Sequence, residues 1–253
     1  MFPIDDAELA FNAEIIRDKS YVGRTILVGR DEDSRLTLGC ALSGRSDDSR
    51  NRFLRAHHHS GRVRTAVSDP SRPPKDPKLT IYDAMLQGGG KFIVSNGHQS
   101  NAIQSGLSRR RKLKERRSFC DTMQEWDYEP DPSHTPRIAC IASLFEEEPF
   151  LQIAIVEKSP FDDTSVRRFW TYKDLPPGIG LFLSTYEDDG DPLPPWKGNP
   201  LFIKLGFGPQ KILDQLKELL DGPNYVAAAV KTVRSKLSNS TIVVDNRYPP
   251  VDD

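Results

Sequence analysis

The residues best suited to chemistry lie between positions 126 and 138. This stretch combines three acids, two aromatic residues, a histidine, a threonine, an arginine and three prolines, and it separates a helical pattern from a strand pattern. Prolines fix the backbone and offer no N–H donors, so we expect a stiff, irregular connection that holds its polar side chains in fixed directions. Such a connection suits a site for proton transfer or ligand binding. The alternative is a solvated turn with Asp and Ser as caps.

An arginine-rich loop, residues 43–52, is a second candidate. It follows a predicted strand and carries Arg45, Arg50 and Arg52 within eight residues. A guanidinium group presents a planar fork of donors that fits phosphate or carboxylate oxygens, so the loop is a candidate anion clamp. Solvated turns of Arg and Asp are common in proteins, and such a turn is the alternative.

Two apolar strand patterns end in polar residues. Residues 91–94 run into Ser95, Asn96 and Gly97 directly before a helical pattern, and residues 180–184 run into Thr185 and Tyr186. The first arrangement places Asn96 and free backbone N–H groups at the mouth of a strand, where they can bind an anionic or polar ligand.

Two other clusters have a structural explanation that we favour. The histidines at 57–59 are adjacent, so on an extended chain they alternate faces, and no cysteine or carboxylate follows at ligand spacing. Residues 109–117 hold seven basic residues in nine and could bind nucleic acid. We interpret them as a solvated helical face, because the formal net charge of the whole chain is −1.

The composition indicates a globular protein of a reducing compartment. The chain has 253 residues, 35 basic and 36 acidic, and three scattered cysteines that suggest neither a disulfide scaffold nor a metal site. It has no basic, apolar leader and no long apolar run. We therefore expect a cytoplasmic protein that contacts neither membrane nor nucleic acid.

The hydrophobic patterns predict sheets packed together with outer helices, an α+β arrangement. The predicted helices are residues 8–18, 99–125 in two pieces, 209–220 and 225–237. The predicted strands are residues 21–28 and 36–43 as a hairpin, 63–67, 79–81, 91–94, 137–145, 151–156, 167–172, 180–184 and 241–245. Residues 69–77 and 192–200 are Pro-rich and are expected to be loops.

Several short motifs occur in the same order as in a known family. They are Tyr21-x-Gly23-Arg24, Gly29-Arg30, Ser43-x-Arg45-Ser46 with Asn51-Arg52, Val94-Ser95-Asn96-Gly97, Tyr128-Glu129-x-Asp131 with Thr135-Pro136-Arg137-Ile138-Ala139, and Ser184-Thr185-Tyr186-Glu187. From about residue 21 to 187 the chain resembles the archaeal-type IMP cyclohydrolases. The longer arginine loop and the insert at 69–77 depart from the archaeal pattern.

The resemblance implies a fold and an activity. The fold would be a four-layer αββα sandwich similar to that of N-terminal nucleophile hydrolases, without their N-terminal nucleophile. The whole chain, 1–253, would form one domain, with 1–20 as an N-terminal extension and 192–253 as a less well matched C-terminal part. The activity would close 5-formamidoimidazole-4-carboxamide ribotide to inosine monophosphate (IMP) in purine biosynthesis. A purine ribonucleotide would be substrate and product, no metal or organic cofactor would be needed, and a homo-oligomer is expected.

The resemblance also implies roles for individual residues. The expected catalytic residues are Glu129, Tyr82, Arg52 and Asp127, with Glu129 as the principal proton-transfer carboxylate. The expected substrate-binding residues are Arg24, Arg45, Arg50, Asn51, Asn96, Gly97, Thr135, Arg137 and Tyr186.

Two other functions remain open at this point. One is an amidohydrolase with a true N-terminal nucleophile, which would require cleavage just before Cys40 or Ser43. The other is a nucleotide- or RNA-binding module built on residues 109–117, although that run lacks interleaved aromatic residues.

Overall fold

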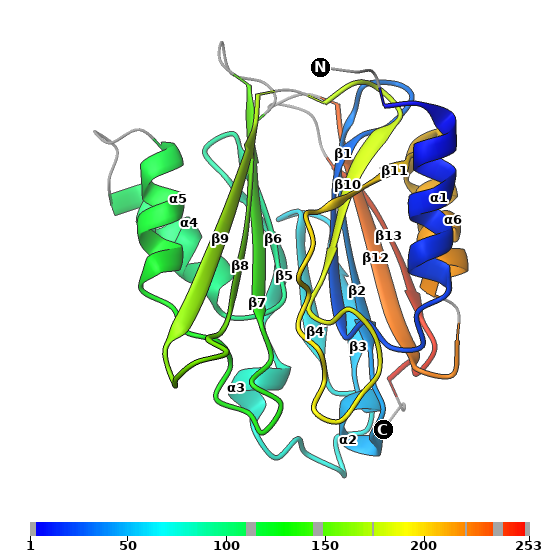
Figure 1. Ribbon diagram of the computed structural model, residues 1–253. Helices are drawn as coiled ribbons and strands as arrows, with labels where there is room; N and C mark the ends of the chain where they lie inside the picture. Colours follow the sequence, from blue (N-terminus) through cyan, green and yellow to red (C-terminus); the bar gives the residue numbers. More distant parts are fainter. Residues whose placement is uncertain are drawn as a thin grey trace.

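The computed structural model describes residues 4–109, 115–143, 149–173, 175–220, 222–234 and 240–250. These residues form a mixed α+β structure in which two antiparallel sheets face each other and the longer helices cover their outer faces (Figure 1). The predicted fold class, packed sheets with outer helices, is confirmed at this level. None of the helices in the described residues has the length and apolar character needed to cross a membrane.

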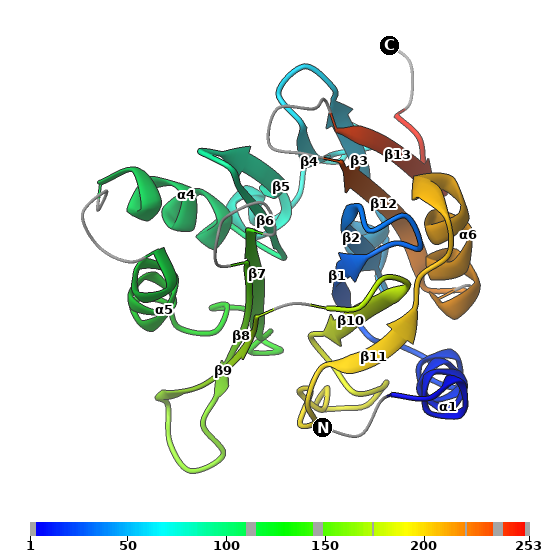
Figure 2. The ribbon, with the colours of Figure 1, turned by 90° about the horizontal axis from the view of Figure 1, so that it is seen from above.

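In the described residues the first sheet has six strands, in the order β11-β10-β1-β2-β12-β13. Helices α1 (Asp6–Arg17) and α6 (Gly208–Leu220) cover its outer face (Figures 1 and 2). The strands are β1 (Arg24–Arg30), β2 (Leu36–Ser43), β10 (Ile179–Ser184), β11 (Leu201–Lys204), β12 (Tyr225–Val233) and β13 (Thr241–Asn246).

The second sheet has seven strands over the same described ranges, and they follow the chain order from β3 to β9. Helices α4 (Gln99–Arg109) and α5 (Glu115–Gln124) lie on its outer face (Figure 2). The strands are β3 (Phe53–His57), β4 (Arg62–Ala66), β5 (Asp83–Gly88), β6 (Lys91–Ser95), β7 (Arg137–Ser143), β8 (Phe150–Lys158) and β9 (Ser165–Tyr172). Two one-turn helices, α2 (Asp47–Arg50) and α3 (Pro77–Thr80), lie in the connections.

Most predicted elements are confirmed within a few residues, but the helix predicted at 225–237 is wrong. Residues Tyr225–Val233 form β12, every residue of which is buried. The segment Ala227-Ala228-Ala229 favours a helix by propensity, yet β12 lies inside its sheet and is covered on both faces. A continuous apolar run of this kind does not distinguish a buried strand from a buried helix.

Smaller differences come from short elements. The strand predicted at 79–81 is wrong, because Asp76 caps a helical turn there and the strand begins only at Asp83. Strands β3 and β11 were not predicted. Both are short, with five and four residues, and neither shows a sustained alternation of buried and exposed side chains. The basic run at 109–117 lies largely outside the described residues, so the RNA-binding alternative has no structural test.

The two sheets share an apolar core, and polar side chains also connect them. The Asn246 amide of β13 pairs with the backbone of Leu54 in β3, accepting from its N–H at 2.8 Å and donating to its carbonyl at 3.1 Å. Lys231 of β12 is 1% exposed, and its Nζ donates to the Gly61 carbonyl at 2.8 Å and to the side chain of Gln87 in β5. Burial lowers the pKa of Lys231 to about 7.

The buried ammonium predicts a pH-dependent stability. From about pH 7 to about pH 9 the unfolded chain keeps its proton on Lys231 while the native protein releases it, so the free energy of unfolding rises with pH. We expect Lys231→Met to remove this rise in urea titrations, and the exposed control Lys204→Met to retain it. An unchanged slope in Lys231→Met would contradict the assignment.

Candidate active site

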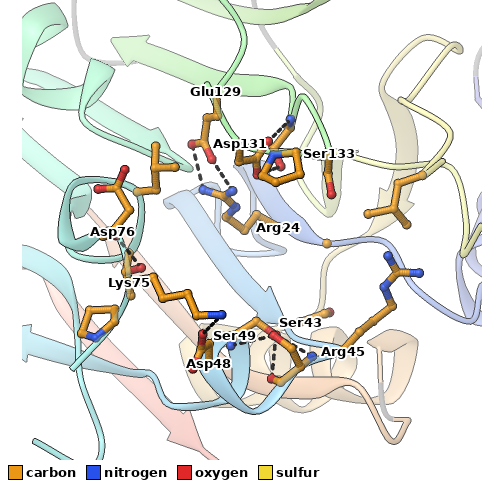
Figure 3. A pocket seen from close by; sticks show the side chains of 18 of the residues that line it. Arg24, Ser43, Arg45, Asp48, Ser49, Lys75, Asp76, Glu129, Asp131 and Ser133 are labelled. Carbon is orange, nitrogen blue, oxygen red and sulfur yellow. Dashed lines mark hydrogen bonds and ion pairs between the residues drawn. The ribbon is translucent and has the colours of Figure 1, made fainter. Parts of the chain in front are cut away.

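A cavity of about 590 Å³ lies where the start of β1 meets the connection between α5 and β7 (Figure 3). Its walls come from five parts of the chain. They are residues 21–24 at the start of β1, the arginine loop, the Pro-rich connection between β4 and β5, residues 129–135, and the stretch after β10 that contains Tyr186 and Leu193. The lining residues used below are Tyr21, Gly23, Arg24, Ser43, Arg45, Ser46, Asp48, Ser49, Arg52, Lys75, Glu129, Asp131, Thr135 and Tyr186.

Glu129 is the central carboxylate of the inner end of this cavity. It is 1% exposed, and Arg24 binds both of its oxygens, from Nη1 to Oε1 at 2.9 Å and from Nη2 to Oε2 at 2.5 Å (Figure 3). Arg137 Nη1 also lies 3.4 Å from Oε1. Two guanidinium groups therefore hold one buried carboxylate, and the Arg24 contact has the two-pronged geometry that gives the strongest charged hydrogen bonds.

The backbone around Glu129 is fixed by local hydrogen bonds. The Glu129 N–H donates to the Thr135 carbonyl at 2.8 Å, and the Asp131 carboxylate accepts from the Thr135 N–H and hydroxyl at 2.8 and 2.5 Å. The Thr135 hydroxyl also lies 2.6 Å from the Tyr186 hydroxyl. This short ladder, together with the prolines, explains how an irregular connection holds a carboxylate in one place.

Two glycines allow the close packing at the inner end. Gly23 has φ +71°, and a Cβ there would lie 2.3 Å from Thr185 Oγ1. A Cβ on Gly97 would lie 2.6 Å from Gln99 Oε1 and 3.2 Å from Glu129 Oε1. Larger residues at these positions would push the site apart.

Burial controls the ionisation of these groups. It raises the pKa of Glu129 above its ordinary value, although Arg24 and Arg137 both act to lower it. Burial opposes the charge on Arg24, but the Glu129 carboxylate, together with Tyr82 and Tyr186, outweighs it and raises the pKa of that guanidinium. The pair thus consists of a permanent cation and a carboxylate whose pKa lies above that of an exposed glutamate.

Arg52 is a second buried guanidinium in the same cavity. It is 7% exposed and donates to two backbone carbonyls, from Nε to Ser49 at 2.8 Å and from Nη2 to Ser43 at 3.3 Å. No ion pair with a carboxylate of the described residues is found for it, and burial lowers its pKa. A buried cation without a counter-ion, facing a cavity, is suited to bind a negative group of a ligand.

Tyr82 lies beneath the cavity rather than on its surface. It is 1% exposed, and burial raises the pKa of its hydroxyl, while the charges of Arg24 and Arg52 act to lower it. The phenol therefore keeps its proton at neutral pH and can serve as a donor.

The outer end of the cavity has a different character. Arg45 lies over the ring of Tyr21 at 5.0 Å, pairs with Asp189 and donates to the Gly190 carbonyl at 3.1 Å. Ser49, Lys75 and Asp48 also lie there (Figure 3), and the side chains of Lys75 and Asp48 are exposed. Charged groups at this end are solvated, so each contributes less than a charge at the buried end.

The structure brings together many of the predicted site residues. Arg24, Arg45, Arg52, Glu129, Thr135 and Tyr186 line the cavity. Behind them, the Asn96 side chain joins β6 to β7, donating to the Pro136 carbonyl and accepting from the Ile138 N–H, both at 2.8 Å.

Seven predicted residues do not line the cavity. Tyr82, Asn96, Gly97 and Arg137 lie behind it, next to residues that do, whereas the side chains of Asp127, Arg50 and Asn51 have other partners. The Asp127 carboxylate is 75% exposed and pairs with Arg167 at 3.0 Å, while only its backbone carbonyl supports Arg137. Arg50 donates to the Gly44 carbonyl at 3.0 Å, and the Asn51 amide binds backbone groups of Asp69 and Arg72. These contacts assign the three side chains to holding loops in place.

Other lining residues were not predicted. Tyr21, Gly23 and Asp131 stand inside the family motifs, so the signal was present, but neither charge nor spacing singled them out. Lys75 lies in a Pro-rich piece with no recognisable motif, and only the fold brings it to the cavity. Among the described residues, no group of three His, Cys, Asp or Glu side chains is placed to hold a metal ion, and the histidines at 57–59 are no exception.

Two comparisons with known proteins bear on this site. Residues 21–236 match the family model described as IMP cyclohydrolase-like protein. An IMP cyclohydrolase of Haloquadratum walsbyi (strain DSM 16790 / HBSQ001) is 27% identical over 121 residues, which are 48% of this chain and 56% of that protein. The chain thus spans little more than half the length of this curated relative, and the matched family region contains all of the cavity residues named above.

The geometry of the pair predicts a strong energetic coupling. Glu129→Gln leaves Arg24 and Arg137 without their carboxylate, so we expect a loss of about 3 kcal/mol in the free energy of unfolding. Arg24→Gln should lose a similar amount of stability, and the variant with both substitutions should lose clearly less than the sum of the two single losses. Urea titrations of wild type, the two single variants and the double variant measure these losses. Strictly additive losses would contradict a paired carboxylate, and Asp189→Asn, which breaks an exposed pair, serves as the control with a loss below about 1 kcal/mol.

Proposed function

The chain belongs to the IMP cyclohydrolase-like protein family, and on that premise we propose that it closes 5-formamidoimidazole-4-carboxamide ribotide to IMP with loss of water. The observation that carries the proposal is the inner end of the cavity, where Arg24 holds a buried carboxylate. The same cavity is lined by Arg52, whose guanidinium forms no ion pair within the part of the chain that the structure describes. These groups supply proton transfer and charge stabilisation without a cofactor.

The cavity suits a nucleotide in size and charge. Its volume of about 590 Å³ lies within the range of small-molecule sites. Arginines at both ends favour an anionic ligand, while Tyr21 and Tyr186, whose rings stack 5.9 Å apart, add aromatic surface. A purine ribotide with its phosphate toward Arg45 matches this distribution.

The reaction forms one bond and breaks another. The carboxamide nitrogen attacks the formyl carbon, and the formyl oxygen leaves as water with one proton from the carboxamide nitrogen and one from the formamido nitrogen. Because both reacting groups belong to one molecule, holding them in the cyclised rotamer removes much of the entropic barrier. What remains for the protein is to move protons and to stabilise charge on the formyl oxygen.

The residues of the inner end divide this work. Glu129 accepts the proton of the attacking nitrogen and returns it to the departing oxygen, and its raised pKa brings it closer to the working pH. Arg52, which lines the cavity, stabilises the negative charge that develops on the formyl oxygen, and the protonated Tyr82 beneath it supports Arg24 and Arg52 from behind. Arg24 and Arg137 orient Glu129, and Asp127 contributes through its backbone carbonyl.

The proposal carries further expectations. The enzyme would act in purine biosynthesis in the cytoplasm, as a homo-oligomer and without metal or organic cofactor. We infer as well that the layers in Figure 1, helices, sheet, sheet and helices, form the αββα sandwich of N-terminal nucleophile hydrolases as one domain. The arrangement of two facing antiparallel sheets supports that inference.

An assay of the purified protein tests the proposed activity. We expect IMP to form from the formamido ribotide in the presence of a metal chelator, followed by ultraviolet absorbance. Glu129→Gln keeps the shape of the side chain but cannot exchange a proton, so turnover should fall by about 10²- to 10⁴-fold. Asp127→Asn should lose much less, and Asp163→Asn, an exposed surface carboxylate, should match wild type. Absence of IMP formation by wild-type protein would refute the activity, and near-normal turnover by Glu129→Gln would remove it as the base.

The pH dependence gives a second test of Glu129. If its carboxylate is the base in the free enzyme, kcat/KM rises with pH as the carboxyl ionises. Arg137 acts to lower the pKa of Glu129, so Arg137→Gln disfavours the carboxylate and should move the acidic limb to higher pH. Arg167→Gln, which removes a cation that pairs with Asp127 instead, should leave the limb in place. A limb that stays fixed in Arg137→Gln would assign it to another group.

A further inference from the structure

One wall of the cavity is a connection that is longer than its topology requires. Strands β4 and β5 are antiparallel neighbours, which a hairpin loop of about two to five residues can join. Here residues 68–80, called the Pro-rich segment below, extend to the cavity instead, where Pro74, Lys75, Asp76, Leu79 and Thr80 line it. Its helix α3 lies at the same end of the molecule as α2 of the arginine loop (Figure 1).

Both ends of the Pro-rich segment are anchored. At its start, the Asn51 side chain accepts from the Asp69 N–H at 2.7 Å and donates to the Arg72 carbonyl at 2.7 Å. At its end, the Thr65 hydroxyl donates to the Thr80 carbonyl at 2.7 Å. Between these anchors stand Pro73, Pro74 and Pro77, which restrict the backbone, so the position of Lys75 is set in advance.

Lys75 extends toward the arginine loop. Its Nζ lies 3.5 Å from Asp48 Oδ2, with side chains that are 91% and 54% exposed, and Figure 3 shows it directed toward Asp48 and Ser49. An exposed pair at this separation is weak, so Lys75 can exchange Asp48 for a stronger partner at little cost. A phosphate dianion is such a partner, because it offers more charge and more acceptor oxygens than a carboxylate.

We propose that the Pro-rich segment forms the phosphate-binding wall of this cavity and that Lys75 leaves Asp48 to bind the phosphate group of a nucleoside monophosphate. The inference rests on the proposed function. Arg45 and the hydroxyls of Ser46 and Ser49 complete the same wall from the arginine loop. Asp48 has two effects against the ligand: it competes for Lys75, and its own charge repels the phosphate.

The exchange makes an unusual prediction, namely that the two members of one ion pair have opposite effects on binding. Lys75→Ala removes a phosphate ligand, so the Kd for IMP should rise about tenfold. Asp48→Asn removes the competitor, so the Kd should fall about two- to fivefold. Inosine, which lacks the phosphate, should bind all variants alike. Lys78→Ala, on the same segment but not lining the cavity, is the matched control and should bind IMP like wild type.

Calorimetric titration of IMP and inosine into these four proteins tests the proposal. Opposite shifts for IMP with none for inosine support it. Weaker IMP binding by both Lys75→Ala and Asp48→Asn would show that the pair only holds the segment in place, and unchanged binding by Lys75→Ala would remove Lys75 from the site; either result overturns the proposal. If wild-type protein binds no IMP, the proposed function fails. Titration with inorganic phosphate then tests the role of Lys75 separately, with weaker binding expected for Lys75→Ala and tighter binding for Asp48→Asn. Absence of these opposite shifts also overturns the proposal.

Discussion

The ion pair between Arg24 and Glu129 is the interaction on which the site depends. Arg24 opens β1 of the six-stranded sheet, and Glu129 precedes β7 of the seven-stranded sheet, so the pair joins the two layers. A buried ion pair stabilises only when its geometry is good, because both charges lose their hydration. The two-pronged contact therefore requires the sheets to pack in one position. Asn246 and Lys231, which connect the sheets elsewhere, help to fix that position. The packing of the layers therefore determines the geometry of the site.

Positive charge exceeds negative charge around Glu129. Arg24 and Arg137 contact the carboxylate directly, and Arg52 lies near enough for its charge to act on the same groups. Such an excess costs stability in the empty protein, since burial disfavours every one of these charges. The same excess stabilises negative charge that develops in a reacting ligand, and it does so without rearrangement, because the donors are already held by backbone carbonyls. A site whose positive groups are arranged to stabilise the negative charge of a ligand is therefore expected to lower the stability of the protein without that ligand.

The sequence allowed much of this to be predicted, for physical reasons that differ between elements. Helix α6 was predictable because its apolar residues recur with the period of a helix, and the hairpin of β1 and β2 because a short polar turn separates two apolar runs. Strand β12 was not, since its burial on both faces comes from partners far away in the chain. At the site, the order of the motifs indicated Arg24, Glu129 and Thr135 together. The motifs also suggested Asp127, Arg50 and Asn51, but the side chains of these three residues bind neighbouring loops instead of lining the cavity. Residue type and spacing do not determine which way a loop side chain points.

The two ends of the cavity differ in burial, and this difference separates their roles. At the inner end Glu129, Arg52 and Tyr82 are almost fully buried, so the charges of Glu129 and Arg52 act at low dielectric and small displacements matter. At the outer end Arg45 and Lys75 are exposed, with partners that water already screens, so they can change contacts as a ligand arrives. Residues 129–135, stiffened by proline, carry Glu129 at the inner end, and Arg52 joins it there from the end of the arginine loop. The Pro-rich segment and residues 45–49 of the arginine loop carry the outer end. Substitutions in the outer walls can therefore alter which ligand is held while the groups at the inner end keep their geometry.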